Sequence, residues 1–321
     1  IVSTVCCIFS ATIEGFIFFR LIQGIAGAGG IVVSRSIATD RFTGKELAKA
    51  MAIIGAINGI APVASPVLGG FLTDSIGWKG IFIVLLILGV LLLFSNLHFK
   101  ESLSVDNRKR GNLKSLVSSF GIVLKNRRYV YYVLQMGFAM GVLFANISSS
   151  PFIVQQHYGF SAFEFSLFFG INALAIGLAA GLSVKFKNPE HAMFLGSVGM
   201  TMMSAVEFVI LSNEYHFAVY EAVLFVLLFS MGLAFTASTT LAMDCERANS
   251  ASALFGAAGF AFGGIVSPLV GLGDILSTTG LIFFVCSVCS LCFSVLAMNQ
   301  THTNLWGSFK CKMGPVTRFV F

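Results

Sequence analysis

Charge is scarce in this sequence. Only 11% of the 321 residues are charged, and 56% are hydrophobic, whereas soluble domains carry about 25% charged residues. A single water-soluble core cannot hide this much apolar surface. The composition therefore excludes a soluble enzyme or a nucleic-acid-binding domain, in spite of the excess of basic residues, and it indicates an integral membrane protein.

Motifs for catalysis and for metal binding are also missing. The sequence has no HExxH, no Ser-His-Asp spacing and no phosphate-binding P-loop. The run "CSVCSLC" at 286–292 has cysteines at metal-like spacing, but neither histidine nor a carboxylate lies in that segment to complete a site. We expect no enzyme activity, no metal and no cofactor. Without an ATP motif, any transport would be driven by an ion gradient.

Long hydrophobic runs, in contrast, fill most of the chain. A membrane-crossing helix needs about 20 predominantly apolar residues, and nine segments meet that length. They are 14–38, 50–73, 79–98, 129–152, 163–184, 191–212, 217–241, 250–273 and 277–298. A tenth segment, 1–12, would cover only about 18 Å, against a hydrocarbon core of about 30 Å. We therefore expect the chain to begin inside a helix.

The connections between these segments differ in charge. One alternate set holds most of the 20 basic residues, whereas the other set holds only Lys79. The positive-inside rule places the basic set in the cytoplasm, together with the C-terminus. The longest basic connection, 99–128, divides the chain. We expect a remainder of an N-terminal bundle at 1–98, a cytoplasmic linker, a six-helix C-terminal bundle at 129–298 and a cytoplasmic tail at 299–321.

Three motifs resemble one transporter superfamily. "SPVLG" at 65–69 recurs as "SPLVG" at 267–271, which suggests two parallel halves. "RLIQGIAGAGG" (20–30) resembles the fourth-helix motif of the major facilitator superfamily, and "GAINGIAPVASPVLGG" (55–70) resembles its antiporter signature. "SSPFIVQQHYGFSAFEFSLFFGINAL" (149–174) is more specific and resembles the Bcr/CflA drug-resistance transporters.

The resemblance implies an all-α integral membrane fold of two six-helix bundles, here without the first two helices and part of the third. It implies a monomeric drug:proton antiporter of the bacterial inner membrane that works by alternating access. Its partners would be a small apolar or amphipathic substrate, protons and the bilayer, and no nucleic acid. Export of a natural metabolite, such as an amino acid or a siderophore, and an inactive fragment remain alternatives.

Polar residues inside the spans are the candidates for proton coupling. Arg20 lies about 9 Å inside its helix, where a charge costs at least about 2.5 kcal/mol, and Gln23 lies one turn away on the same side. We expect Arg20 to act on an acidic proton carrier of a neighbouring helix; the alternative is that it only anchors the helix. Glu207 is a carboxyl group within an apolar span and a second candidate, ahead of Glu221.

Candidates for the substrate cavity lie on the first helices of the C-terminal bundle. They are Gln135, Met136, Phe138, Asn146 and Asn172. The amide side chains could bond either to the substrate or across helices. Methionine adapts to varied ligands, although such runs also serve plain packing.

The antiporter-like stretch is predicted to be a hinge and an outer seal. Its glycines allow close helix approach and its prolines bend the axis; the residues are Gly55, Gly59, Pro62, Pro66, Gly69 and Gly70. A structural pair of Arg35 and Asp40 is expected near the cytoplasmic end of the preceding helix.

Overall fold

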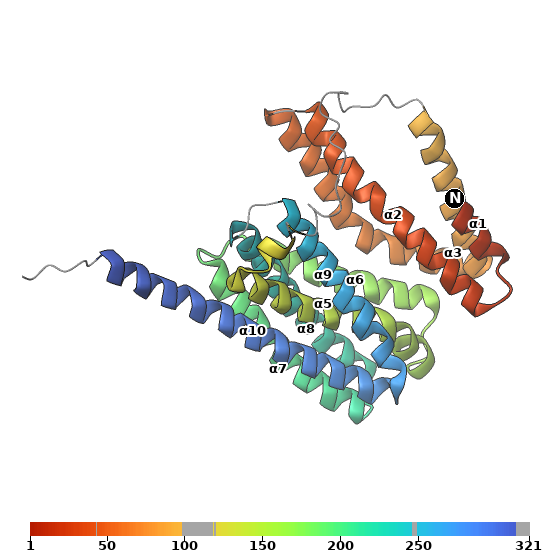
Figure 1. Cartoon of the computed structure of the whole chain (residues 1–321). Coiled ribbons are helices and arrows are strands. Elements are labelled where there is room, and N and C mark those ends of the chain that lie inside the picture. The colour runs from red at the N-terminus through yellow and green to blue at the C-terminus, as the bar shows by residue number, and fades with distance from the viewer. Residues whose placement is uncertain (43, 98–117, 119, 246–248, 313–321) are drawn as a thin grey trace, which may run out of the picture. The chain divides into compact units, whose positions relative to one another are not determined.

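A computed structural model describes residues 1–42, 44–97, 118, 120–245 and 249–312. Within these ranges only the backbone is described for 28–29, 31–36, 38–40, 44–45, 47–52, 54–63, 66, 249–250 and 301–312. The described chain is almost entirely helical (Figure 1). It divides into two compact units, Ile1–Arg110 with Ser161–Gly170, and Gly111–Phe160 with Ile171–Phe321. Most of the predicted linker lies outside the described residues, so the predicted domain boundaries stay a prediction.

The described part of residues 1–97 forms the helices α1 (Val2–Phe9), α2 (Ile13–Arg41) and α3 (Gly44–Leu97) of the first unit. The helix α3 is interrupted at Gly77, whose φ of 70° and ψ of 174° are not helical. A positive φ of this kind favours glycine, because it has no Cβ to clash with the backbone. The break falls between the predicted spans 50–73 and 79–98, whereas α3 continues as a helix through Pro62 and Pro66.

The second unit is built from the helices that follow residue 126, apart from the first half of α6. They are α5 (Arg127–Pro151), the π-helix η2 (Phe152–His157), α6 (Ala162–Ser183), α7 (Pro189–Ser212), α8 (Phe217–Cys245), α9 (Asn249–Leu269), the 3-10 turn η3 (Val270–Leu272) and α10 (Ile275–Lys312). The first half of α6 is assigned to the first unit. The helix α5 packs against α8, α9 and α10, and α7 packs against α8 and α10.

Seven of the described helical segments are long and apolar enough to cross a membrane: 67–97, 127–157, 162–183, 189–212, 217–245, 251–272 and 275–300. They correspond to the last seven predicted spans. The first two predicted spans, 14–38 and 50–73, are helical in α2 and α3, but part of each has only its backbone described.

Local signals in the sequence explain where these helices begin. Asn126 caps α5 by accepting a hydrogen bond from the amide of Tyr129 (3.3 Å), and Asn188 caps α7 by accepting one from the amide of Glu190 (2.9 Å). Short polar side chains satisfy the free N–H groups of a first turn in this way. The polar residues between apolar runs therefore fix the helix starts.

The motif that resembles the drug-resistance transporters forms the turn from α5 into α6. Gly159 has a φ of 77°, a conformation that glycine adopts without a steric penalty. Ser161 and Glu164 then form a reciprocal capping box: the hydroxyl of Ser161 accepts from the amide of Glu164 (3.2 Å), and Glu164 accepts from the amide of Ser161 (2.9 Å). The motif therefore has a local structural function.

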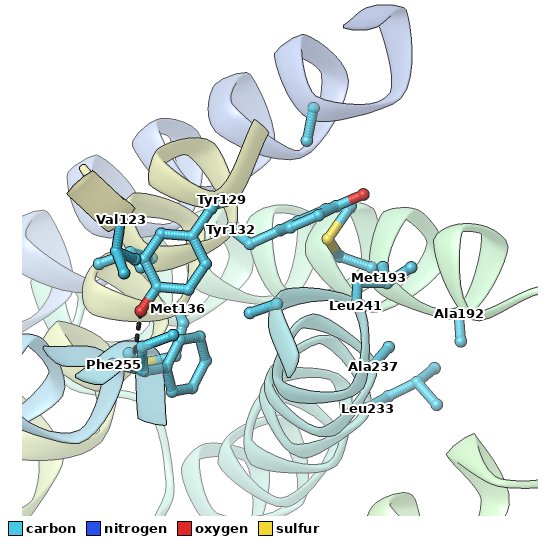
Figure 2. Packing of buried hydrophobic residues seen from close by; sticks show 14 of the residues in the cluster. Val123, Tyr129, Tyr132, Met136, Ala192, Met193, Leu233, Ala237, Leu241 and Phe255 are labelled. Atoms are coloured by element: carbon cyan, nitrogen blue, oxygen red, sulfur yellow. Dashed lines mark hydrogen bonds between the residues drawn. The ribbon is translucent and has the colours of Figure 1, made fainter. Parts of the chain in front are cut away.

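The core of the second unit lies where α5, α7, α8 and α9 meet. Tyr129, Tyr132, Met136 and Phe255 are among its buried residues (Figure 2). The hydroxyl of Tyr129 donates to the carbonyl of Ala251 at 2.6 Å, which ties α5 to α9. A buried phenol in a membrane protein needs such a partner, so this bond fixes the register of the two helices.

Candidate functional site

An apolar cavity lies between α5, α8 and α9. Its volume is about 190 Å³. Methionine, phenylalanine and glycine line it: Met136, Met140, Phe144, Phe235, Phe255, Gly256, Gly259 and Phe260. An engineered apolar cavity of about 150 Å³ binds benzene. The cavity therefore has room for about one aromatic ring or a branched aliphatic group.

Glycines and phenylalanines interlock where α5 and α9 meet next to this cavity. A Cβ added to Gly137 would lie 2.6 Å from the ring of Phe262, and one added to Gly263 would lie 2.3 Å from the ring of Phe144. Each helix thus places a ring over a glycine of the other helix. Small residues allow this close approach, and the contact fixes the cavity wall formed by Phe144.

The structure treats the two apolar candidates differently. Met136 is buried (1% exposed) and lines the cavity, and its contact with a substrate stays a prediction. Phe138 does not line it, because its ring packs edge-on to Phe262 (4.9 Å between centroids) and stacks on Phe293 (5.8 Å). These contacts give Phe138 a packing function between α5, α9 and α10.

The amide candidates on α5 bond within the protein. Gln135 donates from Nε2 to Ser197 Oγ (3.3 Å) and to Ser290 Oγ (3.1 Å), which joins α5 to α7 and α10. Asn146 accepts at Oδ1 from the hydroxyl of Ser150 at 2.6 Å. Neither side chain lines the apolar cavity. Of the two alternatives for these residues, the contacts favour bonding within the bundle.

Asn172, the third amide candidate, belongs to a buried acidic cluster. Its Nδ2 donates to Glu221 Oε1 at 2.9 Å, from α6 to α8. Glu207 on α7 is 0% exposed, and its carboxylate interacts electrostatically with that of Glu221. Both oxygens of Glu207 lack a hydrogen-bond partner among the described residues, as do Glu221 Oε2 and Asn172 Oδ1.

Arg20 and Gln23 meet in the first unit. An N–H of the Arg20 guanidinium donates to Gln23 Oε1, and Gln23 donates from Nε2 to Thr4 Oγ1 on α1 at 2.7 Å. The guanidinium also lies 5.5 Å from the ring centroid of Phe82 on α3, a cation–π distance. Arg20 therefore contacts α3 directly and α1 through Gln23, while its part in proton coupling stays a prediction.

The predicted hinge is only partly described. The backbones of Gly55, Gly59, Pro62 and Pro66 belong to α3, but their surroundings lie outside the described residues, as do the side chains of Arg35 and Asp40. A Cβ added to Gly70 would lie 2.6 Å from Ser166 Oγ and 2.8 Å from the carbonyl oxygen of Ala162, whereas Gly69 has nothing within 4 Å. Of the two glycines of this stretch whose surroundings are described, Gly70 is thus the one at a close helix contact.

One ion pair was not anticipated from the sequence. Arg128 donates to Glu190 at 2.8 Å, and its Nε donates to the hydroxyl of Tyr132 at 2.9 Å. The pair joins the first turns of α5 and α7. In the sequence, both residues directly precede a predicted span on the cytoplasmic side. Their common depth in the membrane was therefore the one sequence feature that could have suggested the pair.

Comparisons with known proteins cover nearly the whole chain. Residues 1–268 match the sequence model of the Major Facilitator Superfamily. The chain is 35% identical over 312 residues to the uncharacterized MFS-type transporter YdgK of Bacillus subtilis (strain 168), which covers 94% of this chain and 78% of that protein.

Two further relatives are named for drug resistance. The bicyclomycin resistance protein homolog of Haemophilus influenzae is 26% identical, over 81% of this chain and 67% of its own length. The multidrug resistance protein MdtL of Klebsiella pneumoniae is 23% identical, over 91% of this chain and 74% of its own length.

Proposed function

Because the chain belongs to the major facilitator superfamily, we propose that it is a proton-coupled exporter of small apolar or amphipathic compounds in the bacterial inner membrane. The superfamily consists of transporters rather than enzymes, and the chain is a multi-pass membrane protein. The observation that carries the proposal is the apolar cavity between α5, α8 and α9. The drug-resistance names of the relatives support the substrate class.

The cavity accounts for recognition of apolar groups. Its lining side chains are methionine and phenylalanine, which form a soft and polarizable wall that tolerates different shapes. Its volume of about 190 Å³ is below the 300–1,000 Å³ of a typical drug-sized site. The cavity therefore takes one ring or one branched group of a substrate, and the rest of the molecule binds outside it.

Proton exchange supplies the driving force in this proposal. Arg20, held by Gln23 and by the ring of Phe82, provides a fixed positive charge within α2. Such a charge favours the ionised form of a nearby carboxyl group and so promotes proton release. Glu207 of the second unit, whose carboxyl group is 0% exposed, is a candidate proton carrier. External protons would enter in exchange for cytoplasmic substrate by alternating access.

The glycine-rich half of α3 would act as a hinge in this cycle. Gly70 packs against Ser166 and the carbonyl of Ala162, so this contact has no room for a side chain. Tightly packed helix contacts switch between discrete arrangements rather than deform gradually. The two helices at Gly70 could therefore slide past each other or separate as rigid bodies during the transport cycle.

The test uses the full chain reconstituted into lipid vesicles. A neutral aromatic dye should move against its gradient when a pH difference is imposed, and the movement should stop when an ionophore collapses that difference. An Arg20→Ala variant should lose this proton-driven transport while it still binds the dye. Dye transport that persists without a pH difference would refute proton coupling, and a chain that neither binds nor moves apolar dyes would refute the substrate class.

A further inference from the structure

Glu207 carries a carboxyl group that is buried in the interior of the second unit. It lies on α7, five residues before the helix ends at Ser212, which places it about 7.5 Å from that end. Its side chain is 0% exposed, and neither carboxylate oxygen has a hydrogen-bond partner among the described residues. Burial of an ionised carboxylate in this way is costly, so the group must gain a proton or a cation.

A second carboxyl group lies at the same level of the bundle. Glu221 is in the second turn of α8, and its charge and that of Glu207 interact. One oxygen of Glu221 accepts from Asn172 at 2.9 Å, whereas Oε2 is buried without a partner. Two carboxylates close enough to interact cannot both be charged at low cost, so a proton bound to one of them removes the repulsion as well as the burial penalty of that group.

No positive side chain of the described residues balances this pair. The ion pair of the second unit is Arg128 with Glu190, in the first turns of α5 and α7, and so at the opposite end of α7 from Glu207. The described polar groups next to the pair are Asn172 of α6, which bonds to Glu221, and Tyr220 of α8, which interacts with both carboxylates. The titratable residues beyond them are Tyr158, which interacts with Glu207 and with Glu214 of the loop, and His157 of η2, whose ring contacts that of Tyr158.

Aromatic rings cluster around Tyr158, which directly follows η2. Tyr158 contacts the rings of Phe217 (5.2 Å) and Tyr220 (5.7 Å), and its hydroxyl donates to the carbonyl of Tyr215 at 2.9 Å. Burial raises the pKa of the Tyr158 phenol, and the charge of Glu207 raises it further. Tyr158 is half-buried, bonds to the 213–216 loop at Tyr215 and interacts electrostatically with Glu207.

We propose that Glu207 and Glu221 together form a proton-binding site inside the C-terminal bundle, which exchanges its proton with the solution at the 213–216 loop beside Tyr158. The site is separate from the apolar cavity, which lies between α5, α8 and α9 and which neither carboxyl group lines. Its part in transport rests on the proton-driven exchange proposed above, whereas proton binding itself does not.

The direct test is infrared spectroscopy of the full chain in lipid, with difference spectra recorded as the pH is changed. A protonated buried carboxyl group gives a carbonyl band that shifts in D₂O. We expect this band at neutral pH in the unmodified chain. Glu207→Gln should abolish it and Glu221→Gln should weaken it, whereas Glu214→Gln, which changes an exposed acid of the adjacent loop, should leave it unchanged.

Three controls make the outcome decisive. Glu207→Asp keeps an acid at the buried position and should keep a band even if Glu207→Gln does not fold. Gly256→Leu fills the apolar cavity and should leave the band unchanged. A loss of substrate binding in this variant with the band retained therefore tests the substrate cavity separately from the proton-binding site. Absence of the band at neutral pH, or a band insensitive to both Glu→Gln changes, would overturn the proposal. Loss of the band when Na⁺ replaces choline at constant pH would assign the pair to a metal cation instead.

Discussion

Gly256 offers a way to fill the apolar cavity from its own wall. It lines the cavity on α9, and a Cβ added there meets nothing within 4 Å. Its neighbour on the cavity wall, Gly259, is different, because a Cβ there would lie 3.2 Å from Met136 Sδ. Leucine at position 256 should therefore enter the open space without displacing the helices, and the isobutyl group should occupy the place of a substrate ring.

The magnitude follows from the apolar area that the substrate no longer buries. Full burial of a side chain of phenylalanine or leucine size stabilises by about 1.5–3 kcal/mol. Each 1.4 kcal/mol corresponds to a factor of ten in affinity. Gly256→Leu should therefore weaken the binding of a ligand that uses the cavity by about 10- to 100-fold. The helix itself should gain rather than lose stability, because leucine is a better helix former than glycine by about 0.8 kcal/mol.

The assay is equilibrium binding of a neutral aromatic dye to the purified full chain in lipid, followed by dye fluorescence. Gly264→Leu is the matched control. Gly264 is on the same helix, is likewise exposed with nothing within 4 Å of an added Cβ, and does not line the cavity. Both variants add the same side chain to α9, so any difference between them comes from the cavity.

Unchanged affinity of the Gly256→Leu variant would refute this reasoning. It would mean that the dye binds elsewhere and that the cavity between α5, α8 and α9 is a packing defect. An equal loss of affinity in both variants would also refute it, because the effect would then come from a leucine on α9 in general.

Three further predictions concern the fold. Gly70→Ala should lower the melting temperature and the transport rate, because the new Cβ would lie 2.6 Å from the Ser166 hydroxyl. Gly69→Ala is the control and should change neither, because a Cβ there meets nothing within 4 Å. Similar effects of both variants would show that the contact at Gly70 does not determine stability or transport. Asp274 caps α10 by accepting from the amide of Ser277 at 2.9 Å, and this bond holds the pKa of its carboxyl group below the ordinary value. The stabilisation by this cap should thus be present above about pH 4 and be lost as the pH falls through the folded-state pKa. Asp274→Asn should remove this pH dependence in a series of denaturation measurements. Asp274→Ala should lower the free energy of unfolding by about 1 kcal/mol. Glu190→Ala should cost about 1 kcal/mol in unfolding assays, because Arg128 is only partly exposed and loses its 2.8 Å partner; unchanged stability would indicate that water replaces the carboxylate without loss.

Sequence patterns were sufficient for the helices and the family. Long apolar runs separated by short polar breaks predicted the seven candidate spans that the structure describes. The predictions succeed because the bilayer requires every backbone group to be satisfied within a helix, so hydrophobicity alone marks the segments. The resemblance to the major facilitator superfamily rested on short motifs, and the family match over residues 1–268 confirms it.

The candidate site was predicted only in part. Met136 was expected to contact substrate and does line the cavity, but Phe235, Phe255 and Phe260 could not be distinguished from the many other phenylalanines of the chain. Periodicity is uninformative when a helix is apolar on all sides, because lipid-facing and cavity-facing residues then look alike.

Polar residues show the same division between sequence and structure. The sequence identified Glu207, Asn172 and Gln135 as unusual, because a polar group within a span is costly wherever it lies. It could not say that Gln135 bonds to serines of α7 and α10, or that Asn172 bonds to Glu221. Partners this distant along the chain are set by helix rotation and packing, so only the tertiary structure decided which of these polar groups are hydrogen-bonded and that the Glu207 carboxylate is buried without a hydrogen-bond partner among the described residues.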